Sequence, residues 1–216
     1  MKPEPQRLRA CSAPVLLILA AMLLSACSIV PDAPPVQLLD PRPDIPAPAH
    51  PGVDWRLDVA RPESDPVRDS TRVLVRTSDG RLQVQGASRW IAAPPDLLRG
   101  MLLRHIRDHA VTADAAAGGS GAEHLLAIDL RRFELDEAGD PRAAIMAVIV
   151  LEARLYQSPR YRMIDRRRFE FDAPLAAFEP GAINTALETA LAGLIADLTD
   201  WLIRDTDSRR DAIMVD

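Results

Sequence analysis

The chain has 216 residues, 26% of them charged and 48% hydrophobic, which suits one globular domain with a core of its own. Its formal net charge is −5 at pH 7. An acidic chain without a basic excess argues against a nucleic-acid partner.

The first 26 residues have the pattern of a signal peptide. Three basic side chains come first, at Lys2, Arg7 and Arg9. A mostly apolar run follows over residues 13–24 and is too short to span a bilayer as a helix. Removal of residues 1–26 leaves 190 residues and lowers the net charge from −5 to −7, because the segment carries three basic side chains and one acidic side chain.

The residues Leu24-Ser25-Ala26-Cys27 resemble the lipobox of bacterial lipoproteins. In such a motif the cysteine thiol is joined to diacylglycerol before cleavage, so Cys27 is expected to be the acylated N-terminus. The alternative is an ordinary secretory signal with an incidental cysteine. Because Ser28 and not aspartate follows Cys27, the resemblance implies the periplasmic face of the outer membrane of a Gram-negative bacterium. Cys11 is removed with the signal, so no thiol remains for a disulfide, a zinc site or a nucleophile.

Residues 28–52 contain eight prolines and predict an extended, semi-rigid tether. At about 3.1 Å per residue the tether would reach roughly 75 Å. A short strand at 36–39 fits within it. The expected organisation is therefore a tether over 27–52, including Cys27, and one folded domain over 53–205.

The domain begins with strands. Alternation over 55–59 predicts the first of them. Residues 72–76 and 81–85 predict a hairpin, because the turn between them contains Asp79-Gly80 and glycine supplies the positive φ. Pro94, Pro95 and Asp96 then predict the start of a helix. Its apolar stripe is formed by Leu98, Met101, Leu102, His105, Ile106 and His109.

Three longer strands follow a glycine-rich loop at 118–121. Residues 125–135 change their buried face near Arg131-Arg132, which predicts either a bulge or a switch of the partner strand. Residues 143–151 are almost continuously apolar, as in a central strand, and 161–171 alternate.

A final helix is predicted over 180–204, and residues 206–216 are expected to form a loose tail. The apolar stripe of this helix comprises Ile183, Leu187, Leu191, Leu194, Leu198 and Trp201. The predicted fold class is α+β, with an antiparallel sheet of about five to six strands and two main helices packed on one face.

Three features together resemble the ABC-type transport auxiliary lipoproteins, the PqiC-like family. They are the lipobox, the stretch from Val75-Arg76 to Pro94-Pro95 with its Ser88-Arg-Trp-Ile-Ala-Ala-Pro-Pro segment, and the hairpin from 151–155 to 168–169. The resemblance implies a non-enzymatic outer-membrane lipoprotein. Its partners would be an MCE-domain protein and an inner-membrane ABC transporter that move lipids, with phospholipids as the expected class. It also implies a small sheet with helices on one side and a ring-like homo-oligomer.

No catalytic, cofactor-binding or metal site is expected. His105 and His109 have the spacing of two zinc ligands on a helix, but no glutamate general base lies between them, so they are interpreted as structural. Residues 136–140 lack the ligand spacing of a calcium loop, and 118–121 lack the lysine of a phosphate loop.

Five arginines mark a possible contact surface: Arg131, Arg132, Arg166, Arg167 and Arg168. Arg166 and Arg168 share one strand face, and strand pairing would bring Arg132 beside them. Their guanidinium groups either pair with carboxylates of a partner or lipid phosphates, or form a solvated face paired with acidic side chains of the chain itself. Trp90 is expected to fill the junction of hairpin and helix, or else to contact a partner.

Two functions fit these features. The first is a docking adaptor, fixed to the outer membrane through Cys27, that completes a lipid route with an MCE-domain protein. The alternative is an outer-membrane lipoprotein that reaches through peptidoglycan to regulate a cell-wall synthase.

Overall fold

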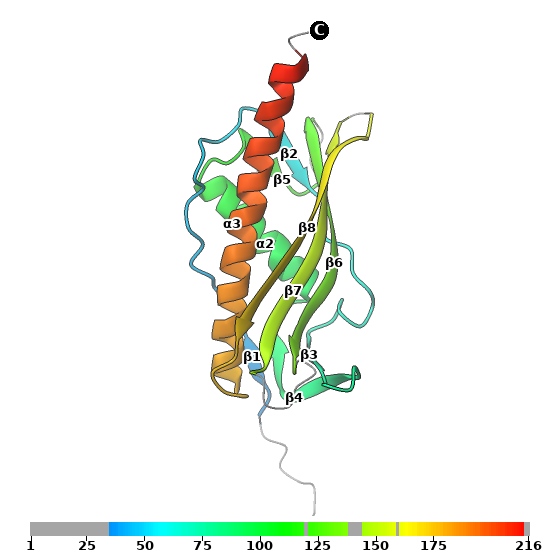
Figure 1. Cartoon of the computed structure of the whole chain (residues 1–216), viewed down its shortest axis with the longest axis vertical. Helices are drawn as coiled ribbons and strands as arrows, with labels where there is room; N and C mark the ends of the chain where they lie inside the picture. Colours follow the sequence, from blue (N-terminus) through cyan, green and yellow to red (C-terminus); the bar gives the residue numbers. More distant parts are fainter. Residues whose placement is uncertain (1–34, 119–120, 138–143, 159, 214–216) are drawn as a thin grey trace, which may run out of the picture. The chain divides into compact units, whose positions relative to one another are not determined.

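The computed structural model describes residues 35–118, 121–137, 144–158 and 160–213, with side chains described as far as Arg204. Cys27 and the turn at 138–140 lie outside these ranges. Two helices and eight strands make up the described domain (Figure 1). The α+β class is therefore confirmed.

The sheet is organised around the long strand β6 (His124–Asp136). One edge of β6 pairs antiparallel with β7 (Met146–Gln157), which pairs antiparallel with β8 (Arg162–Pro174). Its other edge is shared by two short strands, both parallel to β6. β2 (Arg56–Val59) pairs near the start of β6, and β3 (Arg72–Arg76) pairs at its end.

Three more strands complete the sheet. β4 (Leu82–Trp90) pairs antiparallel with β3, β1 (Gln37–Leu39) pairs parallel with β4, and β5 (Asp114–Ala116) pairs parallel with β2. The sheet is thus mixed and eight-stranded, so the expectation of an antiparallel sheet of five to six strands is wrong. The difference arises because β6 is 13 residues long, and two shorter strands fit along one edge of it.

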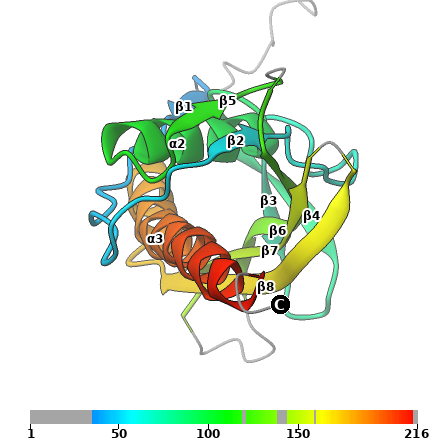
Figure 2. The same cartoon turned by 90° about the horizontal axis from the view of Figure 1, so that it is seen from above.

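Both helices contribute to one hydrophobic core on one face of the sheet. Figure 2 shows the sheet curving around α2 (Pro94–Asp108) and α3 (Pro180–Ile213). The stripe predicted for α3 is buried throughout, and that of α2 is buried except for His109. The backbone of α3 continues to Ile213, so the loose tail expected from residue 206 is wrong over most of its length.

A bulge in β6 decides which of its side chains face the core. The pairing with β7 moves from Leu130–Leu151 to Arg132–Val150, which leaves Arg131 as the extra residue and confirms the predicted position. Leu130 and Phe133 therefore both face the core. The side chains of Arg132, Glu134 and Asp136 lie on the opposite side of the sheet, called the outer face below.

The predicted hairpin is confirmed between β3 and β4. Gly80 has a φ of 84°, in the left-handed region that glycine adopts without strain. The N–H of Thr77 donates to the carbonyl oxygen of Arg81 at 2.9 Å and closes the turn.

Residues 36–52 pack against the domain, whereas the sequence placed them in a tether. The predicted strand is present as β1, and Leu39 is 4% exposed. Two backbone N–H groups between the prolines donate to carboxylates of α3, from Arg42 to Glu188 Oε1 at 2.8 Å and from Ala49 to Asp200 Oδ1 at 3.2 Å. The compact unit consequently begins at Val36 and not at residue 53.

Candidate functional site

A buried carboxylate lies at the centre of a charged cluster on the outer face. The side chain of Glu134 is 0% exposed and accepts hydrogen bonds from Arg68 Nη2, from Arg76 Nε at 2.7 Å and from Arg132 Nε at 2.9 Å. Burial by itself raises the pKa of Glu134. The three guanidinium groups more than offset that effect and hold the pKa below its ordinary value.

Two further carboxylates balance the charge of this Glu134 cluster. Arg68 Nη1 also donates to Asp65 Oδ2 at 2.5 Å, and Arg132 Nη2 donates to Asp136 Oδ2. Three arginines and three carboxylates therefore neutralise one another. Since Asp65 and Arg68 belong to the connection between β2 and β3, the cluster fastens that connection to the sheet.

The cluster places Arg132 in a structural role. Strand register puts Arg132, Arg166 and Arg168 on the same face, as expected, but β7 lies between them. Arg132 is committed to Glu134 and Asp136 and is 26% exposed, so it has little freedom to bind a partner.

Arg166 and Arg168 on β8 belong to the expected contact surface and are exposed on the outer face. Arg168 pairs with Glu170 at 2.8 Å, and both side chains are more than half exposed, so this ion pair contributes little stability. Arg166 is exposed and makes no ion pair within the described part of the chain. By contrast, Arg131 pairs with Asp129 and Glu152.

Arg167 also differs from its two neighbours. It lies over the ring of Phe169, 5.1 Å from the ring centroid, and thus belongs to the other face of β8. Among these three neighbouring arginines of β8, Arg166 and Arg168 therefore carry the positive charge on the outer face.

Trp90 lies inside the core. It is 1% exposed and meets the ring of Phe133 edge-on, with the centroids 5.4 Å apart. This burial fits the expected role at the junction of hairpin and helix. The alternative of a partner contact fails for Trp90, because the side chain has almost no accessible surface.

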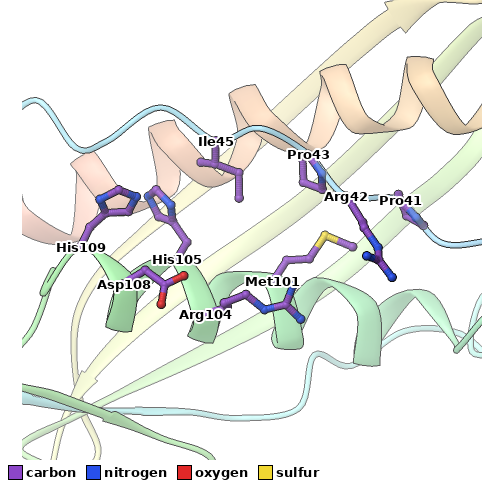
Figure 3. Close-up of a pocket in the computed structure, with 9 residues that line it drawn as sticks. All are labelled: Pro41, Arg42, Pro43, Ile45, Met101, Arg104, His105, Asp108 and His109. Carbon is purple, nitrogen blue, oxygen red and sulfur yellow. The ribbon is translucent and has the colours of Figure 1, made fainter.

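The histidine pair lines a small pocket between α2 and the proline-rich segment (Figure 3). The pocket has a volume of about 200 Å³ and is lined by Pro41, Arg42, Pro43, Ile45, Met101, Arg104, His105, Asp108 and His109. The rings of His105 and His109 are 4.6 Å apart, and His105 is 4% exposed. No group of three or more potential ligands suited to a metal ion occurs among the described residues.

The environment of His105 favours its neutral form. Burial lowers its pKa below the ordinary 6.5, and the neighbouring charge of His109 adds to that shift. Asp108 and Asp200 act in the opposite direction without reversing it. His105 is consequently a core histidine, as interpreted from the sequence.

Within the described ranges no helix is long and apolar enough to cross a membrane.

The family model of the ABC-type transport auxiliary lipoprotein component matches residues 37–199, so the chain belongs to that family. It is similar to the crystal structure of protein XCC0632 from Xanthomonas campestris, assigned to family DUF330, with 31% identity and a TM-score of 0.74. That match covers 82% of this chain and 98% of the other. A second crystal structure, of an uncharacterized protein, shares the fold at 15% identity with a TM-score of 0.60, over 77% of this chain and 99% of the other. No curated protein matches significantly.

Proposed function

We propose that this chain is a lipid-anchored, non-catalytic docking component of an MCE/ABC-type lipid transport system at the periplasmic face of the outer membrane. The observation that carries the proposal is the family match over residues 37–199, which begins ten residues after the expected lipidation site at Cys27. Phospholipids are the expected cargo of the system.

Few residues separate the expected lipid anchor from the folded domain. This supports an adaptor that meets its partner close to the membrane in which it is anchored. Val36 is nine residues after Cys27, which corresponds to at most about 30 Å of extended chain. The tether of 25 residues expected from the sequence would reach roughly 75 Å, a length that suits a regulator acting through peptidoglycan. Because residues 36–52 are packed on the domain, most of that length is not available.

The outer face of β8 is the surface that we propose for the MCE-domain partner. Arg166 and Arg168 carry accessible guanidinium groups, which suit carboxylates on the facing protein. A partner carboxylate could replace Glu170 at Arg168 with little loss of domain stability, because exposed ion pairs are weak.

Crosslinking in intact cells tests the function. The acylated protein is purified after crosslinking and its partners are identified by mass spectrometry. Recovery of an MCE-domain protein is expected, whereas recovery of a cell-wall synthase without an MCE-domain protein would overturn the proposal in favour of the regulator.

A charge reversal tests the surface. The double variant Arg166→Glu/Arg168→Glu is expected to lose most of the crosslinked partner. Arg81→Glu is the matched control, since Arg81 is 72% exposed and pairs only with its neighbour Asp79 among the described residues. Equal losses in the two proteins would exclude β8 as the contact.

A further inference from the structure

A patch of apolar side chains lies at strand β1, which begins ten residues after the expected lipidation site in the sequence. Val36 is 51% exposed, Leu38 is 67% exposed and Ile91 is 53% exposed. The N–H of Ile91 donates to the carbonyl oxygen of Leu39 at 3.0 Å, which holds Ile91 against the end of β1. Several large apolar side chains exposed next to one another indicate a surface that binds a membrane or another molecule.

Two arginines continue this patch across the sheet. Leu38 is the register partner of Arg89 on β4, and Arg89 is the register partner of Arg72 on β3. The side chains of Leu39, Trp90 and Val73, one position further along each strand, face the core. The row Leu38–Arg89–Arg72 therefore lies on the outer face. Val36, Leu38, Ile91, Arg89 and Arg72 are together called the β1 patch.

The arginines of the β1 patch have no carboxylate partner within ion-pair distance among the described residues. Arg89 Nη1 donates instead to the backbone carbonyl oxygens of Ser88 at 2.8 Å and Gln85 at 3.3 Å. Apolar side chains bordered by guanidinium groups suit the interface of an anionic lipid layer. Such a layer takes up the apolar groups at the acyl boundary and the cations at the phosphates.

We propose that the β1 patch rests on the anionic phospholipid surface of the leaflet in which the Cys27 acyl chains are embedded. This inference rests on the anchoring part of the proposed function. Nine residues of chain keep Val36 within about 30 Å of that surface. A link of this length raises the effective concentration of the patch at the membrane to the millimolar range, so a weak intrinsic affinity is sufficient.

This contact would fix the orientation of the domain. β1 lies at one end of the described domain, and the β7–β8 turn lies at the opposite end (Figure 1). With β1 on the lipid, that turn is the end of the domain away from the contact. The contact at β1 also leaves the face of β8 proposed for the partner outside the lipid-facing patch.

Fluorescence at single positions of the acylated full-length mature protein tests the inference. Leu38→Cys and Tyr161→Cys are each labelled with an environment-sensitive fluorophore and reconstituted into vesicles of phosphatidylethanolamine and phosphatidylglycerol. Tyr161 is the matched control because it precedes β8 at the β7–β8 turn and is 68% exposed. The label at position 38 is expected to shift to the blue and to be quenched several-fold more strongly by spin-labelled lipid than the label at 161.

The arginines are tested in the same vesicles. Arg72→Gln/Arg89→Gln in the Leu38→Cys protein is expected to reduce quenching to the level seen on vesicles of phosphatidylcholine alone. Equal quenching at positions 38 and 161 would overturn the inference. A blue shift at 38 without lipid quenching would overturn it too, because a protein surface would then cover the patch.

Mass spectrometry of the purified protein separates this inference from its premise. Acylated protein that fails the quenching test contradicts the membrane contact alone. Protein without acyl chains on Cys27 contradicts the anchoring as well, and with it the proposed function.

Discussion

Replacing Glu134 by glutamine removes the negative charge shared by three guanidinium groups while nearly preserving the size of the side chain. Removing one partner of a buried ion pair costs about 3–5 kcal/mol, because the remaining charge stays buried without compensation. Arg68 and Arg132 keep Asp65 and Asp136 as partners, and Arg76 is 33% exposed. We therefore expect the lower end of that range, about 3 kcal/mol.

Thermal unfolding followed by circular dichroism measures this loss. For a domain of this size 1 kcal/mol corresponds to about 2–4 °C, so Glu134→Gln is expected to lower Tm by about 6–12 °C. Glu170→Gln is the control, because the exposed pair of Glu170 with Arg168 is worth less than about 1 kcal/mol. If both variants lost under about 1 kcal/mol, the Glu134 cluster would add no stability and the reasoning from burial would be refuted.

The pH dependence provides a second measurement on the same variant. The pKa of Glu134 in the folded protein lies below its ordinary value of 4.5, so the folded state keeps its carboxylate when the unfolded state has already bound a proton. The resulting stability is complete above pH 4.5 and is lost as the pH falls toward the folded pKa. The stability difference between wild type and Glu134→Gln should therefore shrink on acidification below about pH 4.5.

Two further predictions concern the helices. Because the pKa of His105 is lowered in the folded protein, the unfolded state binds a proton at this side chain at a higher pH than the folded state does. The free energy of unfolding should therefore fall as the pH drops below 6.5. His105→Gln should flatten a plot of Tm against pH in that range. A Cβ at Gly193 would lie 2.8 Å from the ring of Phe171, so Gly193→Ala should cost about 1–3 kcal/mol in a urea titration. Gly100→Ala on α2 is the control, because a Cβ at Gly100 would have no heavy atom within 4 Å apart from its chain neighbours and the helix backbone. It should stabilise the protein by up to about 1 kcal/mol. A loss of stability in Gly100→Ala equal to that in Gly193→Ala would contradict the steric argument.

The elements that could be predicted from the sequence have either a periodic pattern of apolar side chains over many residues or a strong local signal. The helix from Pro180 shows its stripe over about five turns, and the turn at Asp79-Gly80 has a strong local signal. Even the bulge at Arg131 was predictable, because two consecutive arginines interrupt the alternation of a strand that is otherwise buried.

The short strands have a weaker signal in the sequence. β1 and β5 have three residues each, too few for a period to be recognised. A strand was expected at the position of β1, whereas β5 was not expected. Parallel pairing of β2 and β3 with one edge of β6 depends on contacts between distant parts of the chain. Local pattern therefore led to an antiparallel sheet with too few strands.

The Glu134 cluster had a signal that was not used. The stretch Arg132-Phe-Glu-Leu-Asp136 alternates charged and apolar residues within a strand that is otherwise buried. Three charges on one face of such a strand require partners of opposite charge, because unpaired buried charge is costly. Arg68 and Arg76 were not identifiable as those partners, since they lie 66 and 58 residues away in the sequence from Glu134.

The packing of residues 36–52 connects the fold to its proposed place in the envelope. Proline supplies no N–H group, so a proline-rich segment cannot join a sheet over its whole length and is usually interpreted as a spacer. Here the remaining N–H groups of Arg42 and Ala49 find carboxylates on α3, and Leu39 enters the core. The segment that would have separated domain and membrane thereby becomes part of the domain. If Cys27 is acylated, a partner must meet this domain near the membrane that carries the anchor, because Val36 lies only nine residues after Cys27.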